Sequence, residues 1–189
     1  MSSIVGGIGR FTREDYLKLP ESGPRYQLIQ GELYMSPSPN RYHQTISRNL
    51  GVVLAIYLKD KPMGVIYSAP FDVSLSGQNI FQPDLLFVSN ANKSILTQQG
   101  AQGAPDWIAE ILSKNNAKFD TEIKREIYAK HGVSEYWIVD PDKKEIHLYD
   151  FKIQTEQAVR VVTQKEHFFS NQFPGLDISA EELFLEDKS

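Results

Sequence analysis

The stretch APDWIAEILS, residues 104–113, decides the fold, because it is a strand that is apolar on both of its faces. Side chains alternate along a strand. One face therefore holds Trp107, Ala109 and Ile111, and the other holds Ile108, Glu110 and Leu112. This pattern indicates a strand that is buried on both sides. Glu110 stands out, because a buried carboxylate is costly unless it is paired, protonated or bound to a metal.

The composition is that of an ordinary soluble protein of 189 residues with a formal net charge of -4. The charge argues against a grip on nucleic acid that extends over the whole surface, but it permits a local basic groove. There is no cysteine, so thiolate and disulfide chemistry are excluded. No apolar run is long enough for a membrane span, and the first residues lack a basic signal-peptide region. We expect a cytoplasmic protein.

The order of elements predicts a mixed fold. Helical patterns cover residues 11–19, 40–60, 119–132 and 179–184, and strand patterns cover 25–37, 63–75, 79–89, 134–141, 145–151 and 157–164. Residues 90–103 read as a loop. Some strands alternate with helices and others follow each other as hairpins, which indicates an α/β or α+β fold with one central mixed sheet flanked by helices. We expect one domain over residues 1–189, with 1–10 loosely ordered.

Three acids stand at the edges or centres of apolar strands: Glu32 in GELYM, Asp84 in QPDLLFV and Glu110 in WIAEIL. If their strands are neighbours, Asp84 and Glu110 converge at one end of the sheet. Two nearby carboxylates repel each other, and a divalent cation relieves that repulsion. Oxygen ligands favour Mg²⁺ or Mn²⁺. The four histidines lack the spacing of a zinc site.

Each acid also has a simpler explanation. Aspartate after proline is common in turns, so Asp84 alone is more often structural. Glu32 follows a glycine in a predicted turn and is explained equally well as an exposed residue. Glu110 resists such an explanation best, because apolar residues lie on both sides of it.

The predicted helix at 119–132 adds a further candidate. Asp120, Lys124 and Tyr128 follow each other at four-residue intervals and form one stripe. A helix packed on the sheet can aim Lys124 at Glu110, although a solvated Asp120–Lys124 pair explains the spacing as well. His43 and Gln44 open the predicted helix at 40–60. They either face the same cleft or, more simply, form hydrogen bonds at the helix start.

Taken together, these features resemble the PD-(D/E)XK nuclease superfamily, in which an aspartate after proline and an acid in a following strand act with a lysine. The ordered blocks YQLIQGELYMSPSP, HQTISRNLGVVL, QPDLLFVS, GAPDWIAEILS, DTEIKREIYAKHGVSEYWIVDP and FPGLDISAEELF resemble the Uma-two (Uma2) family, a restriction-endonuclease-like group. These blocks extend over nearly the whole chain.

The resemblance implies a restriction-endonuclease-like core and an Mg²⁺-dependent endonuclease, with Mn²⁺ as a substitute and DNA as the favoured nucleic acid. By position, Asp84 and Glu110 match the motif acids, and Glu32 matches the early glutamate. The backbone carbonyl of Ile111 would complete the metal ligands. The standard motif places lysine where this chain has Leu112, and the resemblance implies that Lys124 replaces it.

Two other functions fit the same sequence. One is a catalytically inactive module that binds nucleic acid or oligomerises, and the other is a metal-dependent phosphodiesterase for small molecules. Superfamily members often pair, so the apolar, tyrosine-rich C-terminal strands are a candidate homodimer surface.

Overall fold

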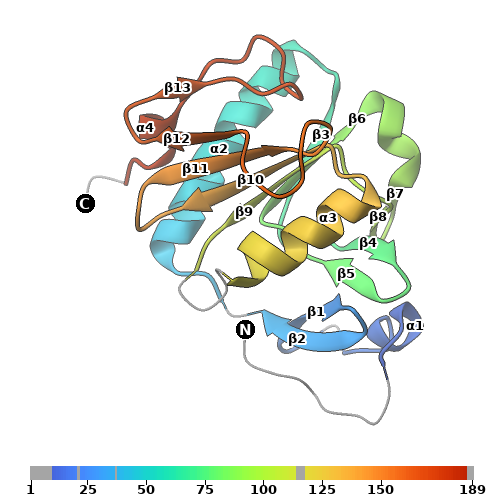
Figure 1. Ribbon diagram of the computed structural model, residues 1–189. Helices are drawn as coiled ribbons and strands as arrows, with labels where there is room; N and C mark the ends of the chain where they lie inside the picture. The colour runs from blue at the N-terminus through green and yellow to red at the C-terminus, as the bar shows by residue number, and fades with distance from the viewer. Residues whose placement is uncertain (1–9, 21, 37, 114–117, 187–189) are drawn as a thin grey trace.

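The computed structural model describes residues 10–20, 22–36, 38–113 and 118–186. The expectation of a loosely ordered start therefore lies, apart from Arg10, outside the described residues. Two six-stranded mixed sheets and four α-helices form the body of the protein (Figure 1). The sequence predicted one mixed sheet, and the structure corrects this to two.

We call the first sheet the central sheet. Its strands, in spatial order, are β12 (Arg160–Thr163), β11 (Glu145–Asp150), β10 (Glu135–Asp140), β9 (Trp107–Ile111), β6 (Leu85–Ser89) and β3 (Gly64–Ser68). Strands β9 and β10 are parallel, and the other neighbours are antiparallel. The predicted hairpin of residues 134–151 is thus confirmed as β10 and β11.

We call the second sheet the side sheet. Its order is β2 (Glu32–Ser36), β1 (Arg25–Ile29), β5 (Asn79–Phe81), β4 (Val73–Ser76), β8 (Gly100–Gln102) and β7 (Leu96–Thr97). A short pair, β13 (His167–Phe168) and β14 (Ile178–Ser179), lies apart from both sheets. Strands β1 and β2 form a hairpin, and the turn predicted before Glu32 lies at Gln30 and Gly31, which have φ of 53° and 82°.

The helices are α1 (Arg13–Tyr16), α2 (Arg41–Asp60), α3 (Arg125–His131) and α4 (Ala180–Leu183), with a 3₁₀ helix η1 (Asn90–Ile95) and a π-helical segment η2 (Phe119–Lys124). Thr12 caps α1 and Ser179 caps α4, each by accepting a hydrogen bond from a backbone N–H of the first turn. Gly132 ends α3 with φ of 95°, a left-handed conformation that suits glycine at a helix end.

Strand β9 is fully buried, and its two faces enter different cores. Trp107, Ala109 and Ile111 pack in a cluster with α2 and α4, whereas Ile108 packs with α3 and the side sheet. The alternation predicted from the sequence is therefore confirmed. The central sheet lies between a layer of α2 and α4 and a layer of α3 and the side sheet (Figure 1).

Residues 79–89 are not one strand. The chain breaks at Gln82–Asp84, so that β5 joins the side sheet and β6 joins the central sheet. The loop predicted for residues 90–103 is also wrong, because it holds η1, β7 and β8. Both errors arise because strand pairing depends on distant segments that local patterns do not reveal. Within the described ranges, no helix is long and apolar enough to cross a membrane.

Candidate active site

A large cleft opens where the ends of several elements meet: the start of α2, the start of β6, the end of β9 and the segment η2. Its volume is about 1250 Å³. Asp84, Glu110 and Lys124 line it together, and the β1–β2 hairpin supplies the opposite wall through Arg25, Gln27 and Ser36. Three of the four side chains that the sequence singled out for catalysis therefore face one space.

Strand register explains why Asp84 and Glu110 meet. Strand β6 runs antiparallel to β9, with Leu85 opposite Ala109. Asp84 precedes Leu85 and Glu110 follows Ala109, so the two acids lie at the same end of this strand pair. The Oδ2 atom of Asp84 accepts a hydrogen bond of 2.8 Å from the backbone N–H of Ile111. This bond fixes the carboxylate of Asp84 against the end of β9.

Glu110 belongs to a buried ionic cluster with Lys124 and Asp120. The Nζ atom of Lys124 lies 2.8 Å from Glu110 Oε1 and 2.8 Å from Asp120 Oδ1. Tyr128 also donates a hydrogen bond of 2.8 Å to Glu110 Oε1. Lys124, Glu110 and Asp120 are 2%, 4% and 3% exposed, so solvent screens these charges only weakly. The predicted stripe on the helix thus faces the sheet and is not solvated.

The segment that carries Asp120 and Lys124 is π-helical, and α3 continues from it. Single π-helical turns are rare and frequently occur at functional sites. The turn before it, residues 114–117, lies outside the described residues. The local geometry thus places the lysine of the site on a helix, whereas the standard motif position, directly after β9, holds Leu112, which is partly buried against the core.

Burial dominates the electrostatics of this cluster. It raises the pKa of Glu110 to about 8, an effect that Lys124 opposes and that Asp120 and Asp84 reinforce. Burial likewise raises the pKa of Asp120, against the influence of Lys124. Burial disfavours the charge on Lys124, but the two carboxylates outweigh it and raise the pKa of the amine. The lysine therefore stays protonated, whereas burial disfavours the negative charge on both carboxyl groups.

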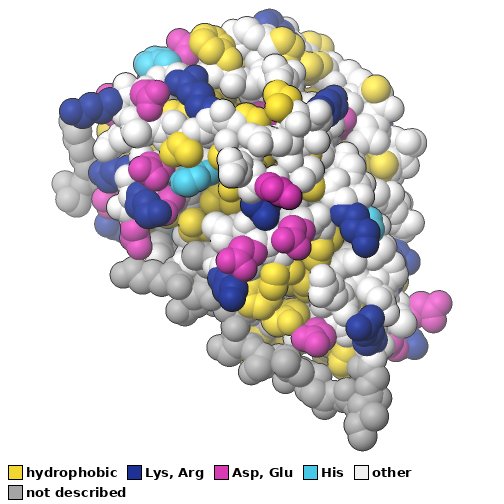
Figure 2. Space-filling model, viewed as in Figure 1, with side chains coloured by type: hydrophobic (Ala, Val, Ile, Leu, Met, Phe, Trp, Pro, Cys, Tyr) yellow, Lys and Arg dark blue, Asp and Glu magenta, His cyan; other side chains and the backbone are white. Residues whose placement is uncertain are grey.

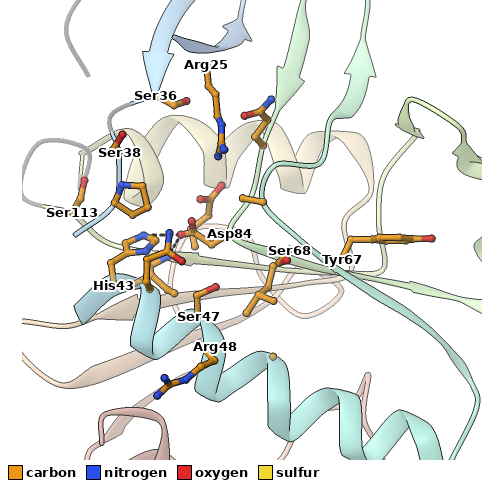
Figure 3. A pocket seen from close by; sticks show the side chains of 18 of the residues that line it. Arg25, Ser36, Ser38, His43, Ser47, Arg48, Tyr67, Ser68, Asp84 and Ser113 are labelled. Carbon is orange, nitrogen blue, oxygen red and sulfur yellow. Dashed lines mark hydrogen bonds and ion pairs between the residues drawn. The ribbon is translucent and has the colours of Figure 1, made fainter. Parts of the chain in front are cut away.

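His43 faces the cleft, which is one of the two alternatives that its position in the sequence left open. Its Nε2 atom lies 3.1 Å from Asp84 Oδ2, and the residue is 7% exposed. Burial opposes protonation of the ring, but the hydrogen bond and charge of Asp84 raise its pKa. The Nδ1 atom is buried and has no hydrogen-bond partner among the described residues. Figure 3 shows the ring beside Asp84 at the first turn of α2.

A signal for His43 was present in the sequence. His43, Ile46, Leu50 and Leu54 follow each other at helical spacing, and all four are buried. The histidine therefore occupies the first position of the buried face of α2, where a polar ring needs a partner.

Glu32 is the one predicted site residue that the structure separates from the others. It is exposed at the start of β2 in the side sheet and is absent from the described lining of the cleft. Its Oε2 atom accepts a hydrogen bond of 2.7 Å from Tyr34. Its catalytic role stays a prediction from the resemblance alone.

The donor atoms suit a hard divalent cation. Asp84 and Glu110 offer carboxylate oxygens, and a peptide carbonyl at Ile111 is a ligand of the same type. When ionised, Glu110, Asp120 and Lys124 together carry one surplus negative charge, and Asp84 adds a second. In the described part of the chain, no group of three or more acidic or histidine side chains forms a metal site by itself.

Comparison with known proteins first establishes the class of fold. A crystal structure from Anabaena variabilis, described as "a putative nuclease belonging to DUF820", matches with a TM-score of 0.77. It is 23% identical, and the match covers 92% of this chain and 97% of that chain. At this identity the likeness shows the fold alone, and it confirms the mixed α/β architecture expected from the sequence.

The family follows from the sequence match. The model of the Uma2 family, described as "Putative restriction endonuclease", matches residues 13–181. The chain therefore belongs to the Uma2 family. An uncharacterised protein of Synechocystis sp. is 26% identical over 139 residues, which make up 72% of this chain and 78% of that protein.

Proposed function

We propose that this protein is a metal-dependent endonuclease that hydrolyses phosphodiester bonds of nucleic acid. One observation carries the proposal: the ammonium group of Lys124 lies 2.8 Å from Glu110 in a cleft that Asp84 also lines. Two acids in a cleft can hold a metal ion that assists phosphodiester hydrolysis, and a nearby lysine can stabilise the charge that develops on the phosphate. Membership of the Uma2 family supports the same reaction class.

Asp84, Glu110 and the carbonyl of Ile111 are the proposed ligands of Mg²⁺, or of Mn²⁺ as a substitute. When bound, the ion supplies an activated water and neutralises charge that develops on the phosphate. His43 holds the carboxylate of Asp84 in place from the first turn of α2, at 3.1 Å. The raised pKa of the ring favours its positive charge. This charge weakens the repulsion between Asp84 and Glu110 when no metal is bound.

Lys124 has a donor to spare. Its ammonium group carries three N–H donors, of which one forms the hydrogen bond to Glu110, while the charge also forms an ion pair with Asp120 at 2.8 Å. A remaining donor can reach a phosphate oxygen or the attacking water, because Lys124 lines the cleft. The two carboxylates fix the position of the amine and keep it charged, so the protein needs little rearrangement to use it.

The size of the cleft favours a polymer over a small phosphoester. Pockets for small molecules usually have volumes of roughly 300–1,000 Å³ and enclose most of the ligand. The cleft is larger, at about 1250 Å³, and it lies between two sheets, with walls from β1, β2, β3 and α2. A polynucleotide can pass through such a space with one phosphodiester at the carboxylates.

The test is a cleavage assay with single- and double-stranded DNA and RNA in the presence of Mg²⁺, Mn²⁺ or EDTA. We expect internal cuts with either metal and none with EDTA. Asp84→Asn, Glu110→Gln and Lys124→Met should abolish cleavage, while Glu126→Gln, at an exposed acid on the outer face of α3, should not.

Other outcomes of the same assay would support one of the two alternative functions. A gel shift without cuts identifies the inactive binding module, and turnover of small phosphoesters alone identifies the small-molecule phosphodiesterase. Full activity in purified Asp84→Asn or Glu110→Gln would reject the proposed metal ligands.

A further inference from the structure

One face of strand β1 runs from the core of the protein into the cleft. Side chains alternate along a strand, so Arg25, Gln27 and Ile29 share this face. Ile29 is 3% exposed and packs in the core that includes α3. Gln27 is 4% exposed and lines the cleft, and Arg25 lines the cleft and is exposed. The face that begins in the core therefore ends in the cleft, with Arg25 at its open end.

Gln27 connects this face to the segment that carries Asp84. The backbone N–H of Gln82 donates a hydrogen bond of 3.4 Å to Gln27 Oε1, and Asp84 lies two residues further along the chain. Strand β1 also pairs with β5, where Leu28 lies opposite Ile80. Pairing and hydrogen bonding thus fix the start of β1 relative to Asp84.

The side chain of Arg25 uses this position to reach into the cleft. It extends from the hairpin towards the group around Asp84 (Figure 3). It forms no ion pair with Asp84, Glu110 or Asp120, all of which the structure describes. The guanidinium group and the carboxylates therefore face each other across a space. A phosphodiester held at the carboxylates would turn the oxygen on its far side towards Arg25.

Ser36 lies beside Arg25 on the neighbouring strand. The two residues are directly opposite each other in the β1–β2 pairing, and both line the cleft. The Oγ atom of Ser36 accepts a hydrogen bond of 3.0 Å from Gln27 Nε2. A hydroxyl group that accepts this bond still has its own O–H as a donor. The hairpin thus presents a guanidinium and a hydroxyl group together, and both are donors that suit phosphate oxygens.

Given the endonuclease function proposed above, on which this role rests, we propose that Arg25 is a catalytic residue that binds the phosphate that is cut. Its guanidinium group donates hydrogen bonds to a non-bridging oxygen of that phosphate, and the hydroxyl of Ser36 is a second donor. Arg25 releases no proton, because a guanidinium group stays charged in proteins. It stabilises the negative charge that develops on the phosphate oxygens in the transition state.

Arg25 complements Lys124. Lys124 is 2% exposed and lies 2.8 Å from both Glu110 and Asp120, so it is held in the wall that η2 forms. Arg25 reaches the same cleft from the side sheet. Two cations that approach from different elements hold a phosphate in one orientation, and correct orientation lowers the barrier to attack.

The first measurement is the cleavage rate at saturating oligonucleotide with Mg²⁺. Arg25→Ala should lower this rate by about 100-fold or more, because it removes a donor to the transition state. Affinity for the same oligonucleotide, measured by fluorescence anisotropy with Ca²⁺ in place of Mg²⁺, should fall by less than about tenfold. Ser36→Ala should lower the rate by about tenfold, the effect of one hydrogen bond to a charged group.

A control separates the position of Arg25 from its charge. On the face shown in Figure 2, basic side chains outside the cleft are interspersed with acidic ones. Arg41 of α2 is such an exposed residue; it lies 3.5 Å from Glu186 and is outside the described cleft lining. Arg41→Ala should change neither the rate nor the affinity. Thermal melting checks that each variant is folded.

Rescue by guanidinium ions separates contact with the substrate from a structural role. Arg25→Ala leaves space for a small cation in an exposed part of the cleft. Guanidinium chloride, at concentrations far below those that unfold the protein, should therefore restore part of the lost rate. The same salt should not restore Glu110→Gln, in which the missing group is a carboxylate.

The inference is overturned if Arg25→Ala cleaves saturating substrate at the wild-type rate, or if its whole defect lies in affinity. It is also overturned if guanidinium ions restore Arg25→Ala no better than Glu110→Gln. These outcomes all require a wild-type protein that cleaves nucleic acid, so they leave the endonuclease function intact. Absence of metal-dependent cuts by the wild type would instead remove the endonuclease function, and the role of Arg25 with it.

Discussion

Replacement of Lys124 by methionine tests the ionic cluster on which the site depends. Methionine keeps the unbranched apolar stem but removes the ammonium group that lies 2.8 Å from both Glu110 and Asp120. Two carboxylates would then face each other with no cation between them, and all three positions are at least nine-tenths buried. Breaking a buried ion pair by removing one partner costs about 3–5 kcal/mol. We expect a loss of that size at about pH 8.

The loss should shrink as pH falls, and the sign follows from proton linkage. Burial already raises the pKa of Glu110 to about 8 in the folded protein, above the ordinary value of 4.5. As pH falls, such a carboxyl group binds its proton in the folded protein before it does so in the unfolded chain. The free energy of unfolding therefore decreases as pH rises from 4.5 to about 8. Without Lys124, the pKa values of the two carboxyl groups are raised further. Protonation at about pH 5 then relieves the repulsion between them. The charge on Lys124 itself does not change in this window, since its pKa is also raised.

Urea unfolding of the two proteins in EDTA at both pH values provides the measurement. The control is Lys130→Met, which removes an exposed lysine from the same helix and should change stability by no more than about 0.5 kcal/mol. The reasoning is refuted if Lys124→Met costs less than about 1 kcal/mol at both pH values, or if its cost grows towards low pH.

Three further predictions concern the proposed metal ligands, Glu32, and an acid between β12 and β13. Asp84→Asn and Glu110→Gln should each slow metal-dependent cleavage by about 100-fold or more, while thermal melting in EDTA shows a folded protein. Glu32→Gln should leave the cleavage rate unchanged, because Glu32 is exposed outside the described cleft lining; a loss as large as that of Asp84→Asn would return Glu32 to the catalytic set. Hydrogen bonds from the backbone and side chain of Thr163 lower the pKa of Glu166 to about 2 from 4.5. Its stabilising contribution is therefore present above about pH 4.5 and disappears towards pH 2, so the melting temperatures of the wild type and Glu166→Gln should converge at the acid end of a pH series.

The sequence was most informative where local periodicity coincides with burial. The alternation of side chains in β9 correctly predicted that its two faces enter two different cores. It also showed Glu110 as a charged residue at an otherwise apolar, buried position. Spacing in the following helix correctly indicated that Lys124 can reach Glu110. Both features depend only on the repeat of a strand or a helix, which the order of residues fixes.

The sequence was least informative where distant segments determine the outcome. Residues 79–89 look like one apolar strand, yet Phe81 and Leu85 belong to different sheets because their pairing partners differ. The sequence left open whether His43 faces the cleft, and it did not identify Asp84 as the partner, because Asp84 reaches the ring only through the packing of α2 against the central sheet. Conversely, the resemblance to the Uma2 family predicted a catalytic role for Glu32. In the structure Glu32 lies in β2 and does not line the described cleft with the other acids.

The central claim is that Asp84 and Glu110 together hold a divalent cation, and a calorimetric titration with Mn²⁺ tests it most directly. The account predicts saturable binding to the wild type and to the control Glu126→Gln, and affinity weakened by about tenfold or more in Asp84→Asn and in Glu110→Gln. Wild-type protein that shows no saturable binding, or an Asp84→Asn variant that binds Mn²⁺ as well as the wild type, would contradict the account.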